Sequence, residues 1–340
     1  MTSTRIYHKA NDFHNEVLAH CQFPGLSFDA PSWLHNPHLQ ILRTLQLENR
    51  LTNLPYFESE PLTLTDGGKV GLSYWQPKAD AKAMILVLPT ICGCSTSTQL
   101  FLQELRKQLS WPVVVLDRRG HNRPFATPKF NTMGCVQDTS AQIEHIHQRF
   151  PNTRKYLIGL SAGSGLLVRY LGEASNSHLV TAGVAVCPAY DIELNLRHIH
   201  PLYDRYMLRR LKQYFLQPYK KKFGSNRETH FCEDARSVQE FHDRQYAFSG
   251  YTGKDKYYQG SNPMVVARNI RHPLLTINTV DDPVCPPENI DYKLFTEDLN
   301  QGMLLLSPFG SHCGFRVGRW GETSWLCDVI GRYFRFFENE

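Results

Sequence analysis

A serine at the centre of the pentapeptide Gly159-Leu160-Ser161-Ala162-Gly163 is the side chain best suited to covalent chemistry. A short apolar run, 155–160, leads into this motif, and a stretch of helical composition follows it to residue 173. A serine on a sharp turn from a strand into a helix projects its hydroxyl clear of the sheet, near the positive end of the helix. The pattern therefore predicts that Ser161 is a nucleophile. A structural serine in a glycine-rich turn is the alternative.

The groups that would activate this serine follow it in the sequence. A serine needs a base to take its proton and an acid to orient that base, and beyond such a turn the acid and then the base follow later strands. Asp281 and Asp282 come after the apolar run 273–278, and His312 comes after the run 303–306. The order predicts a triad of Ser161, one of the two aspartates and His312. Helix-capping aspartates and a loop histidine are the alternatives.

The negative charge that forms during acyl transfer needs two backbone N–H donors. One comes from the residue after the nucleophile and the other from the loop after the third strand. These donors are predicted to be Ala162 and, in the loop 89–93, Ile91. Cys92 and Cys94 in the same region are interpreted as small packing residues. Chemistry of this kind requires no metal and no organic cofactor.

Alternating strand-like and helix-like segments would position these groups. Strands are predicted at 69–76, 82–88, 112–116, 155–160, 180–187, 273–278 and 303–306. Helices are predicted at 98–109, at 133–149, from the serine turn to 173, between the last two strands, and from about 323. Because the strands are nearly continuous apolar runs, the pattern indicates an α/β protein whose mostly parallel central sheet has helices on both faces.

The chain divides into three parts. Residues 56–188 and 265–340 carry the alternating pattern, residues 1–55 form an N-terminal extension expected to pack on that core, and residues 189–264 contain no convincing strand. About 120 residues separate Ser161 from the aspartate pair, although two βα units need only about 60. The surplus matches segment 189–264, which is therefore predicted to be a helical cap insertion over the site.

Composition and charge exclude several classes of protein. The 340 residues include 37 basic and 32 acidic side chains, and the net charge of +5 is too small to indicate nucleic-acid binding. The longest apolar run is far shorter than the roughly 18–20 residues that span a bilayer, and the polar N-terminus lacks the core of a signal peptide. Nine scattered cysteines without a CxxC pair favour reduced thiols in a cytoplasmic protein. No feature indicates an oligomeric state.

The segment 201–222 inside the predicted cap is strongly basic. It holds one acid, Asp204, and seven basic residues interleaved with leucine and tyrosine: Arg205, Arg209, Arg210, Lys212, Lys220, Lys221 and Lys222. A basic amphipathic segment is typical of peripheral contact with an anionic membrane surface. The alternative is a cap helix whose apolar face packs on the sheet and whose charges are solvated.

Six short motifs are more specific than the serine turn alone. They are WLHNPHLQ at 33–40, RGH at 119–121, GLSAGSGLLVRYLGE at 159–173, EFHD at 240–243 with a Tyr-Tyr pair at 257–258, DDPVCP at 281–286, and GSHCGF at 310–315. Together they resemble the YheT-type branch of the α/β-hydrolase superfamily, which includes bacterial esterase-like proteins, animal lipid hydrolases and yeast medium-chain ethyl ester synthases. The resemblance implies an α/β-hydrolase fold with a triad at Ser161, one aspartate and His312. It favours Asp282, because 282–286 resembles the family's Asp-x-hydrophobic-x-Pro acid turn.

The sequence departs from that family in two places near the predicted site. The oxyanion loop has Pro89-Thr90 where the family has His-Gly or Pro-Gly, and Ser164 replaces the glycine after the serine motif. The leading hypothesis is a serine hydrolase that cleaves small-molecule carboxylic esters of acyl or lipid type. An acyltransferase that resolves the same acyl-enzyme with an alcohol is one alternative. A non-catalytic member of the fold used for binding is the other.

Overall fold

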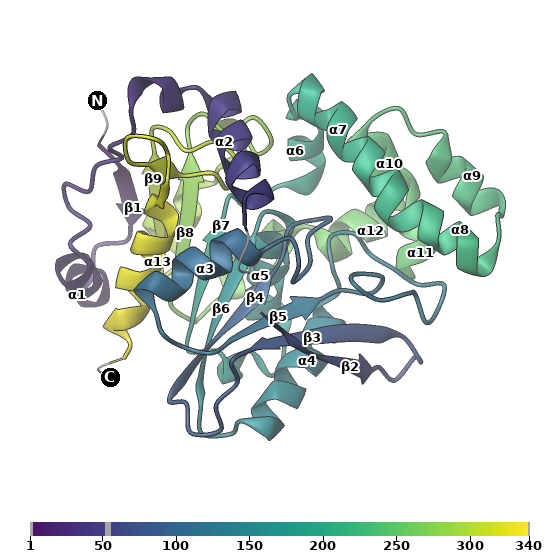
Figure 1. Cartoon of the computed structure of the whole chain (residues 1–340), viewed down its shortest axis with the longest axis horizontal. Helices are drawn as coiled ribbons and strands as arrows, with labels where there is room; N and C mark the ends of the chain where they lie inside the picture. Colours follow the sequence, from purple (N-terminus) through teal and green to yellow (C-terminus); the bar gives the residue numbers. More distant parts are fainter. Residues whose placement is uncertain (1–2, 52–55, 339–340) are drawn as a thin grey trace.

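A nine-stranded sheet crosses the centre of the computed structural model, which describes residues 3–51 and 56–338 (Figure 1). The strands lie side by side in the order β1-β9-β8-β7-β6-β4-β5-β3-β2. Their bounds are β1 Arg5–His8, β2 Glu58–Thr63, β3 Lys69–Trp75, β4 Ala83–Leu88, β5 Val113–Asp117, β6 Arg154–Leu160, β7 Ala182–Val186, β8 Leu274–Thr279 and β9 Gly302–Ser307. A separate two-stranded ribbon pairs β10 (Arg316–Val317) with β11 (Thr323–Ser324).

The six central strands, from β5 through β4, β6, β7 and β8 to β9, run parallel. Their side chains are buried along nearly their whole length, as expected for parallel strands covered on both faces. In the register of β4 with β6, Leu88 lies opposite Gly159. The loop after β4 and the serine turn after β6 therefore start at the same edge of the sheet.

Helices cover both faces of the sheet, so the predicted α/β-hydrolase fold is confirmed. One face packs against α1 (Asp12–Cys21), α3 (Gln99–Gln108) and α13 (Trp325–Phe336). The other packs against α4 (Val136–Arg149) and α5 (Ala162–Glu173). No helix among the described residues is both long enough and apolar enough to cross a membrane.

The N-terminal segment enters the sheet as well as packing on it. β1 pairs antiparallel with β9, with Arg5 opposite Leu306, and helix α2 (Pro37–Asn49) follows a short 3₁₀ turn at Ser32–His35. The four-residue strand has no apolar alternation that the sequence could reveal, because its stability comes from pairing with a strand some 300 residues away. The predicted boundary at residue 55 lies outside the described residues.

The interval between β7 and β8 is helical, and several of its helices lie at the upper right of Figure 1. Most members of one apolar cluster come from this interval. Its helices are α6 (Ile192–His198), α7 (Pro201–Leu211), α8 (Gln217–Phe223), α9 (Arg227–Glu233), α10 (Val238–Arg244), α11 (Tyr246–Ser249) and α12 (Lys254–Ser261). A π-helical turn, Lys212–Leu216, joins α7 to α8. We refer to α6–α12 as the cap.

The helix predicted between the last two core strands is much shorter than expected. Only a π-helical turn, Leu294–Asp298, forms a regular stretch near β9, after a 3₁₀ turn at Pro287–Asn289. Prolines at 283, 286 and 287 lack the N–H that a helix needs, and so they keep this region as a loop. That loop carries the aspartate pair.

Candidate active site

The backbone at Ser161 is strained between β6 and α5. Its φ of 53° and ψ of −118° lie in a region of backbone conformation that residues other than glycine rarely adopt. The flanking glycines are required by space, because a Cβ on Gly159 would lie 2.4 Å from the carbonyl oxygen of Gly163. A Cβ on Gly163 would lie 2.2 Å from the carbonyl oxygen of Leu88 on β4. Close packing of three backbone segments thus holds the serine turn in place.

The side chains of Ser161, His312 and Asp282 form a continuous chain of hydrogen bonds. His312 Nε2 lies 2.7 Å from Ser161 Oγ, and His312 Nδ1 lies 2.9 Å from Asp282 Oδ2. Each residue stands just beyond a different strand, β6, β9 and β8 respectively. The structure therefore brings together the three residues that the sequence predicted, in an order of nucleophile, base and acid.

The two neighbouring aspartates make different contacts. Asp282 is 4% exposed, and its Oδ1 accepts hydrogen bonds of 2.8 Å from the backbone N–H groups of Val284 and Cys285. Asp281 does not contact the imidazole; its Oδ1 accepts a 2.9 Å hydrogen bond from the N–H of Ser311. Asp282 thus orients the His312 ring directly, whereas Asp281 holds the backbone of the loop that carries it.

Electrostatics around His312 favour its charged form. Burial acts to lower the pKa of the imidazole, but the adjacent Asp282 carboxylate outweighs burial and raises that pKa well above its ordinary value. The nearby thiols of Cys187 and Cys285 act in the same direction. This environment would stabilise the imidazolium that proton transfer from Ser161 to His312 would form.

The loop after β4 is held by a buried arginine at the end of β5. Arg118 donates hydrogen bonds to the carbonyl oxygens of Pro89 (2.7 Å) and Thr90 (2.9 Å). Because the C=O and N–H of a trans peptide point in opposite directions, the N–H of Ile91 points away from Arg118. Ile91, Ser161 and Ala162 line the same pocket. This arrangement suits the two predicted oxyanion donors.

A second residue supports the same loop. The buried ring of His121 hydrogen-bonds through Nδ1 to the carbonyl oxygen of Gly93. Burial lowers the pKa of His121 to about 3, so its ring is neutral at physiological pH. Sequence reasoning did not assign a role to Arg118 or His121. The only signal was the Arg-Gly-His motif at 119–121, noted as part of a resemblance.

Two cavities meet at Ser161. A narrow one extends under the cap and is lined mainly by apolar side chains, namely Ile91, Met133, Leu166, Ile192, Leu196 and Ile199. A wide cleft of about 370 Å³ opens on the other side, between α2 and α7. Its walls include Ile41 and Leu45 from α2 and Tyr206, Met207 and Arg210 from α7, with Ser161 and His312 at its floor.

The N-terminal segment is fixed to the loop that follows the base. The buried amide of Gln40 donates to the carbonyl oxygens of Leu34 and Arg316 at 3.0 Å and accepts from the N–H of Arg316 at 2.7 Å. Arg316 in turn pairs with Glu104 on α3. Helix α2 is therefore held as one wall of the wide cleft, a role that sequence reasoning did not find.

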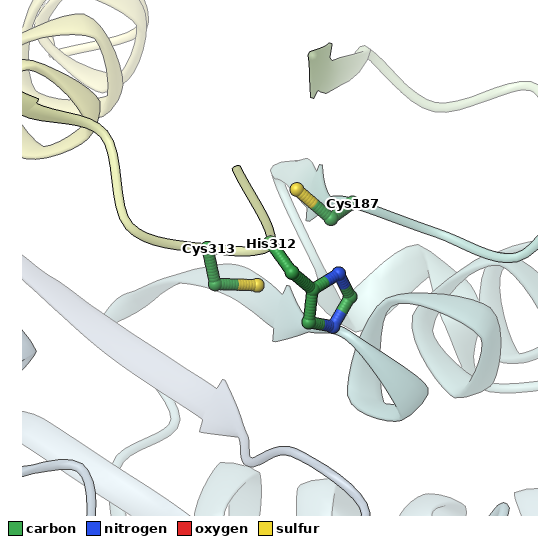
Figure 2. Close-up of side chains that lie close together, drawn as sticks. All are labelled: Cys187, His312 and Cys313. Atoms are coloured by element: carbon green, nitrogen blue, oxygen red, sulfur yellow. The ribbon is translucent and has the colours of Figure 1, made fainter. Parts of the chain in front are cut away.

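Three thiols surround the imidazole, which the sequence did not predict. Figure 2 shows Cys187 and Cys313 on two sides of the His312 ring, and the ligand atoms of these three residues lie within 4.8 Å of one another. Asp282, Cys285 and His312 form a second such group. Soft cations bind this donor set. Because both ring nitrogens already bond to Ser161 and Asp282, a cation held here would compete with the hydrogen-bond chain.

Comparison with known families matches residues 79–302 to the family described as Hydrolase_4: Serine aminopeptidase, S33. This match covers about two thirds of the chain and includes Ser161 and Asp282. It ends ten residues before His312.

Two curated relatives match most of the chain. Embryogenesis-associated protein EMB8 of Picea glauca is 27% identical over 76% of this chain, and this chain spans 61% of that protein. Phospholipase ABHD3 of Homo sapiens is 25% identical over 82% of this chain and 71% of its own length. The described substrate class of the second relative, a phospholipid, is a property of that protein.

Among solved structures, an esterase of Pyrobaculum calidifontis superposes with a TM-score of 0.55. The alignment covers 89% of this chain and 91% of the esterase at 16% sequence identity. At that identity the likeness supports the α/β-hydrolase fold and carries no argument about substrate.

Proposed function

Because the chain belongs to the Hydrolase_4 (serine aminopeptidase, S33) family of α/β-hydrolases, we propose that it cleaves carboxylic esters through an acyl-enzyme on Ser161. Asp282 and His312 complete the proposed triad, and the backbone N–H groups of Ala162 and Ile91 are the proposed oxyanion donors. The observation that carries the proposal is the unbroken hydrogen-bond chain from Asp282 through His312 to Ser161 on a strained turn.

The proposed reaction has two halves. Ser161 Oγ attacks the ester carbonyl carbon while His312 Nε2 accepts its proton, and the N–H donors stabilise the negative oxygen. The imidazolium then gives its proton to the leaving alcohol, which frees an acyl-enzyme. Water, deprotonated by His312, attacks the acyl carbonyl and releases the carboxylic acid and Ser161. Asp282 keeps the ring oriented and stabilises the imidazolium in both halves.

The lining of the narrow pocket favours an acyl ester over the N-terminus of a peptide. A pocket that binds a peptide's α-ammonium group needs an acidic partner, because a buried unpaired charge is costly. No carboxylate lines this pocket among the residues that the structure describes. An aliphatic acyl chain finds apolar contacts there, and the alcohol part would then lie in the wide cleft.

We further propose that the chain belongs to the YheT-type branch of the superfamily and that α6–α12 act as a cap. The support is the WLHNPHLQ segment, two of whose polar residues make defined structural contacts. Asn36 caps α2 through its side chain, and Gln40 fixes that helix to the loop after His312. Reduced cysteines, noted in the sequence, support the further proposal of a cytoplasmic location.

Labelling with a fluorophosphonate probe tests the proposal. The probe reacts with an activated serine, so we expect covalent modification of the wild-type protein at Ser161, read by mass spectrometry of the peptide containing residues 159–163. A folded protein that remains unlabelled, or a label on another serine, would contradict the assignment. A panel of soluble short-chain esters and amides then shows which bond is cleaved.

An acyltransferase would use the same acyl-enzyme with an alcohol as the acceptor. The wide cleft beside Ser161 leaves room for such an acceptor. Product analysis with water and a short alcohol in competition separates the two activities. A carboxylic acid as the main product supports hydrolysis, and a new ester as the main product supports acyl transfer.

A further inference from the structure

Exposed apolar side chains gather on and beside α2 and α7, the two helices that line the wide cleft. Seven of the thirteen large hydrophobic residues that are exposed in the described chain lie on α2, on α7 or beside them: Trp33, Leu39, Leu42, Leu45, Leu202, Tyr206 and Trp320. Leu42 and Leu202 are each 59% exposed, and Trp320 is 63% exposed. We call these seven residues the mouth surface. A concentration of this kind marks an interaction site.

The mouth surface belongs to two helices that are joined at one end. The Nδ1 atom of His38, at the start of α2, forms a 2.8 Å hydrogen bond with the Tyr203 hydroxyl on α7, and the two rings stack. From this contact the two helices form the facing walls of the cleft that has Ser161 at its floor. Both helices lie above the same edge of the sheet in Figure 1. Leu45 and Tyr206 of the mouth surface line this cleft, so a partner that covers them lies beside the entrance to the site.

The apolar patch extends beyond the cleft, onto the other side of α2. Leu39 and Leu42 on α2 line a shallow groove together with Trp33 and Trp320, the latter from the turn between β10 and β11. Leu39, Leu42 and Leu45 follow one another at intervals of three, so they pass gradually around α2 from this groove to the cleft, which Leu45 lines. Neither Leu42 nor Trp320 lines the narrow pocket or the wide cleft.

Unpaired cations accompany the apolar residues. Arg205, Arg209 and Arg210 on α7 are exposed, and none of them takes part in an ion pair with a carboxylate among residues 3–51 and 56–338. Arg50 at the end of α2 and Arg319 beside Trp320 are exposed as well. A surface that is both apolar and positively charged suits an anionic lipid surface, because apolar side chains are buried at the interface and cations are attracted to the headgroups.

Three lysines of the basic segment have partners within the protein. Lys220 forms a 2.5 Å ion pair with Glu233, and Lys222 donates to the carbonyl oxygen of Phe125. Lys212 donates to the carbonyl oxygen of Ala235 at 2.6 Å. Of the seven basic residues that the sequence indicated at 201–222, the exposed arginines of α7 are therefore the strongest candidates for facing a membrane.

We propose that the mouth surface docks this protein on an anionic lipid surface, with its open cleft facing the bilayer. The proposal rests on the proposed function in one respect: an acyl ester in the bilayer could then enter the cleft without crossing water. Leucine and tryptophan side chains would enter the region between headgroups and acyl chains, and the arginines of α7 would lie at the headgroups.

Vesicle sedimentation tests the proposal with two pairs of substitutions. The probes are phosphatidylcholine vesicles with and without phosphatidylserine. Leu42→Ser with Trp320→Ser should lower partitioning about tenfold or more on anionic vesicles, because it removes exposed apolar area. Arg205→Gln with Arg209→Gln should lower it about tenfold on anionic vesicles only, and should flatten its dependence on salt.

Matched controls lie on other surfaces. Phe231→Ser with Val265→Ser removes exposed apolar residues that line neither the cleft nor the groove beside α2, and Arg227→Gln with Arg236→Gln removes exposed arginines of the α9 region. We expect wild-type partitioning for both control pairs. Equal losses in the control and mouth variants, or wild-type binding by both mouth variants, would overturn the proposal.

Two further readouts separate this proposal from the proposed function. All variants should retain fluorophosphonate labelling and turnover of a soluble ester within about twofold, because none of the substituted residues lines either cavity. A wild-type protein that binds vesicles without being labelled would overturn the function and leave the docking intact. A wild-type dimer that ignores vesicles, and that Leu42→Ser with Trp320→Ser makes monomeric, would overturn the docking instead.

Discussion

The edge of the sheet that carries Ser161 differs from the two helices that flank the wide cleft in backbone strain and in how its side chains are held. Five of the eight residues other than glycine with positive φ in the described chain lie at that edge: Ser161, Cys187, Ser311, Cys313 and Phe315. The helices α2 and α7 contain no such residue. Their exposed leucines and arginines lack partners of the kind that fix every group of the triad.

The difference shows that backbone strain is concentrated at the sheet edge, whereas the exposed side chains of the cleft walls are not held in one position. Strain at the sheet edge is tolerated because buried strands on both sides determine the backbone, and it fixes the distances that proton transfer needs. Under the proposed function the cleft walls need no such accuracy, since they would meet an alcohol part of the substrate that varies. Substitutions should therefore affect rate steeply at the edge and gently at the walls.

The largest effect is expected at the nucleophile. Ser161→Ala should lower kcat for a soluble ester by at least about 10⁴-fold, because the members of a triad act as a unit. Ser161→Gly should be as inactive but more stable than Ser161→Ala by about 1 kcal/mol, since glycine accepts a φ of 53° without strain. Activity assays and thermal unfolding measure the two effects. Equal stability of the two variants would show that the turn is not strained.

The next largest effect separates the two aspartates. Asp282→Asn should reduce kcat by about 10³–10⁴-fold, because the ring loses its orienting carboxylate. Asp281→Asn should cost about tenfold or less, since Asp281 accepts a hydrogen bond from the backbone N–H of Ser311 and does not contact the imidazole. A larger loss at Asp281 would reverse the assignment.

The pH dependence of these variants gives an independent measure. His312 must be neutral to accept a proton, so kcat/KM should fall as the pH drops through the pKa of His312. The carboxylate of Asp282 raises that pKa. In Asp282→Asn the pKa should therefore fall, and the acid limb of the residual activity should move to lower pH. An unchanged acid limb would mean that another group controls it.

A smaller effect is expected where the sheet edge meets the oxyanion loop. Arg118→Met removes both hydrogen bonds that turn the carbonyls of Pro89 and Thr90 away from the site. One oxyanion donor is worth about 10²–10³ in kcat, and a misplaced donor should cost about 10–100-fold. KM should change little, because Arg118 does not touch either cavity that holds substrate.

Arg118→Lys serves as the matched control. A lysine can reach one of the two carbonyl oxygens, so its kcat should lie between those of the wild type and Arg118→Met. If KM rises in place of a fall in kcat, or if both variants simply unfold at room temperature, Arg118 supports the core and not the loop geometry.

Local signals explain what the sequence revealed. The central strands are continuous apolar runs, and the glycines of the serine turn are required because a Cβ there would lie under 3 Å from backbone atoms. Both features can therefore be recognised from a few consecutive residues of the sequence. The triad could be placed because each member directly follows such a strand. Asp282 was favoured over Asp281 by a resemblance, and the contacts of the two side chains now give that choice a physical basis.

Long-range contacts explain what the sequence did not reveal. β1 exists only through pairing with β9, and Arg118 acts on carbonyls 28 and 29 positions earlier in the chain. His38 and Tyr203, which join the cleft walls, are 165 positions apart. None of these residues differs locally from an ordinary surface or core residue, and so only the folded chain shows their roles.

The smallest effect is expected at the cleft wall itself. Arg210 on α7 is exposed and lines the wide cleft, where the alcohol part of an ester would lie. An exposed charge pair is worth about 0.2–1 kcal/mol, so Arg210→Gln should raise KM for an ester with a phosphate in its alcohol part by about two- to fivefold. Neither kcat nor the turnover of an uncharged ester should change, because the triad is untouched.

Arg209→Gln is the control for this last prediction, since Arg209 is a neighbouring exposed arginine that does not line the cleft. Soluble short-chain substrates should be used, so that docking on a bilayer contributes nothing. Added salt should reduce the wild-type preference for the phosphate ester toward that of Arg210→Gln, because screening weakens an exposed pair. If Arg209→Gln loses the preference for the phosphate ester as strongly, the arginines act through the summed positive charge of α7. The cleft wall would then have no specific anion contact.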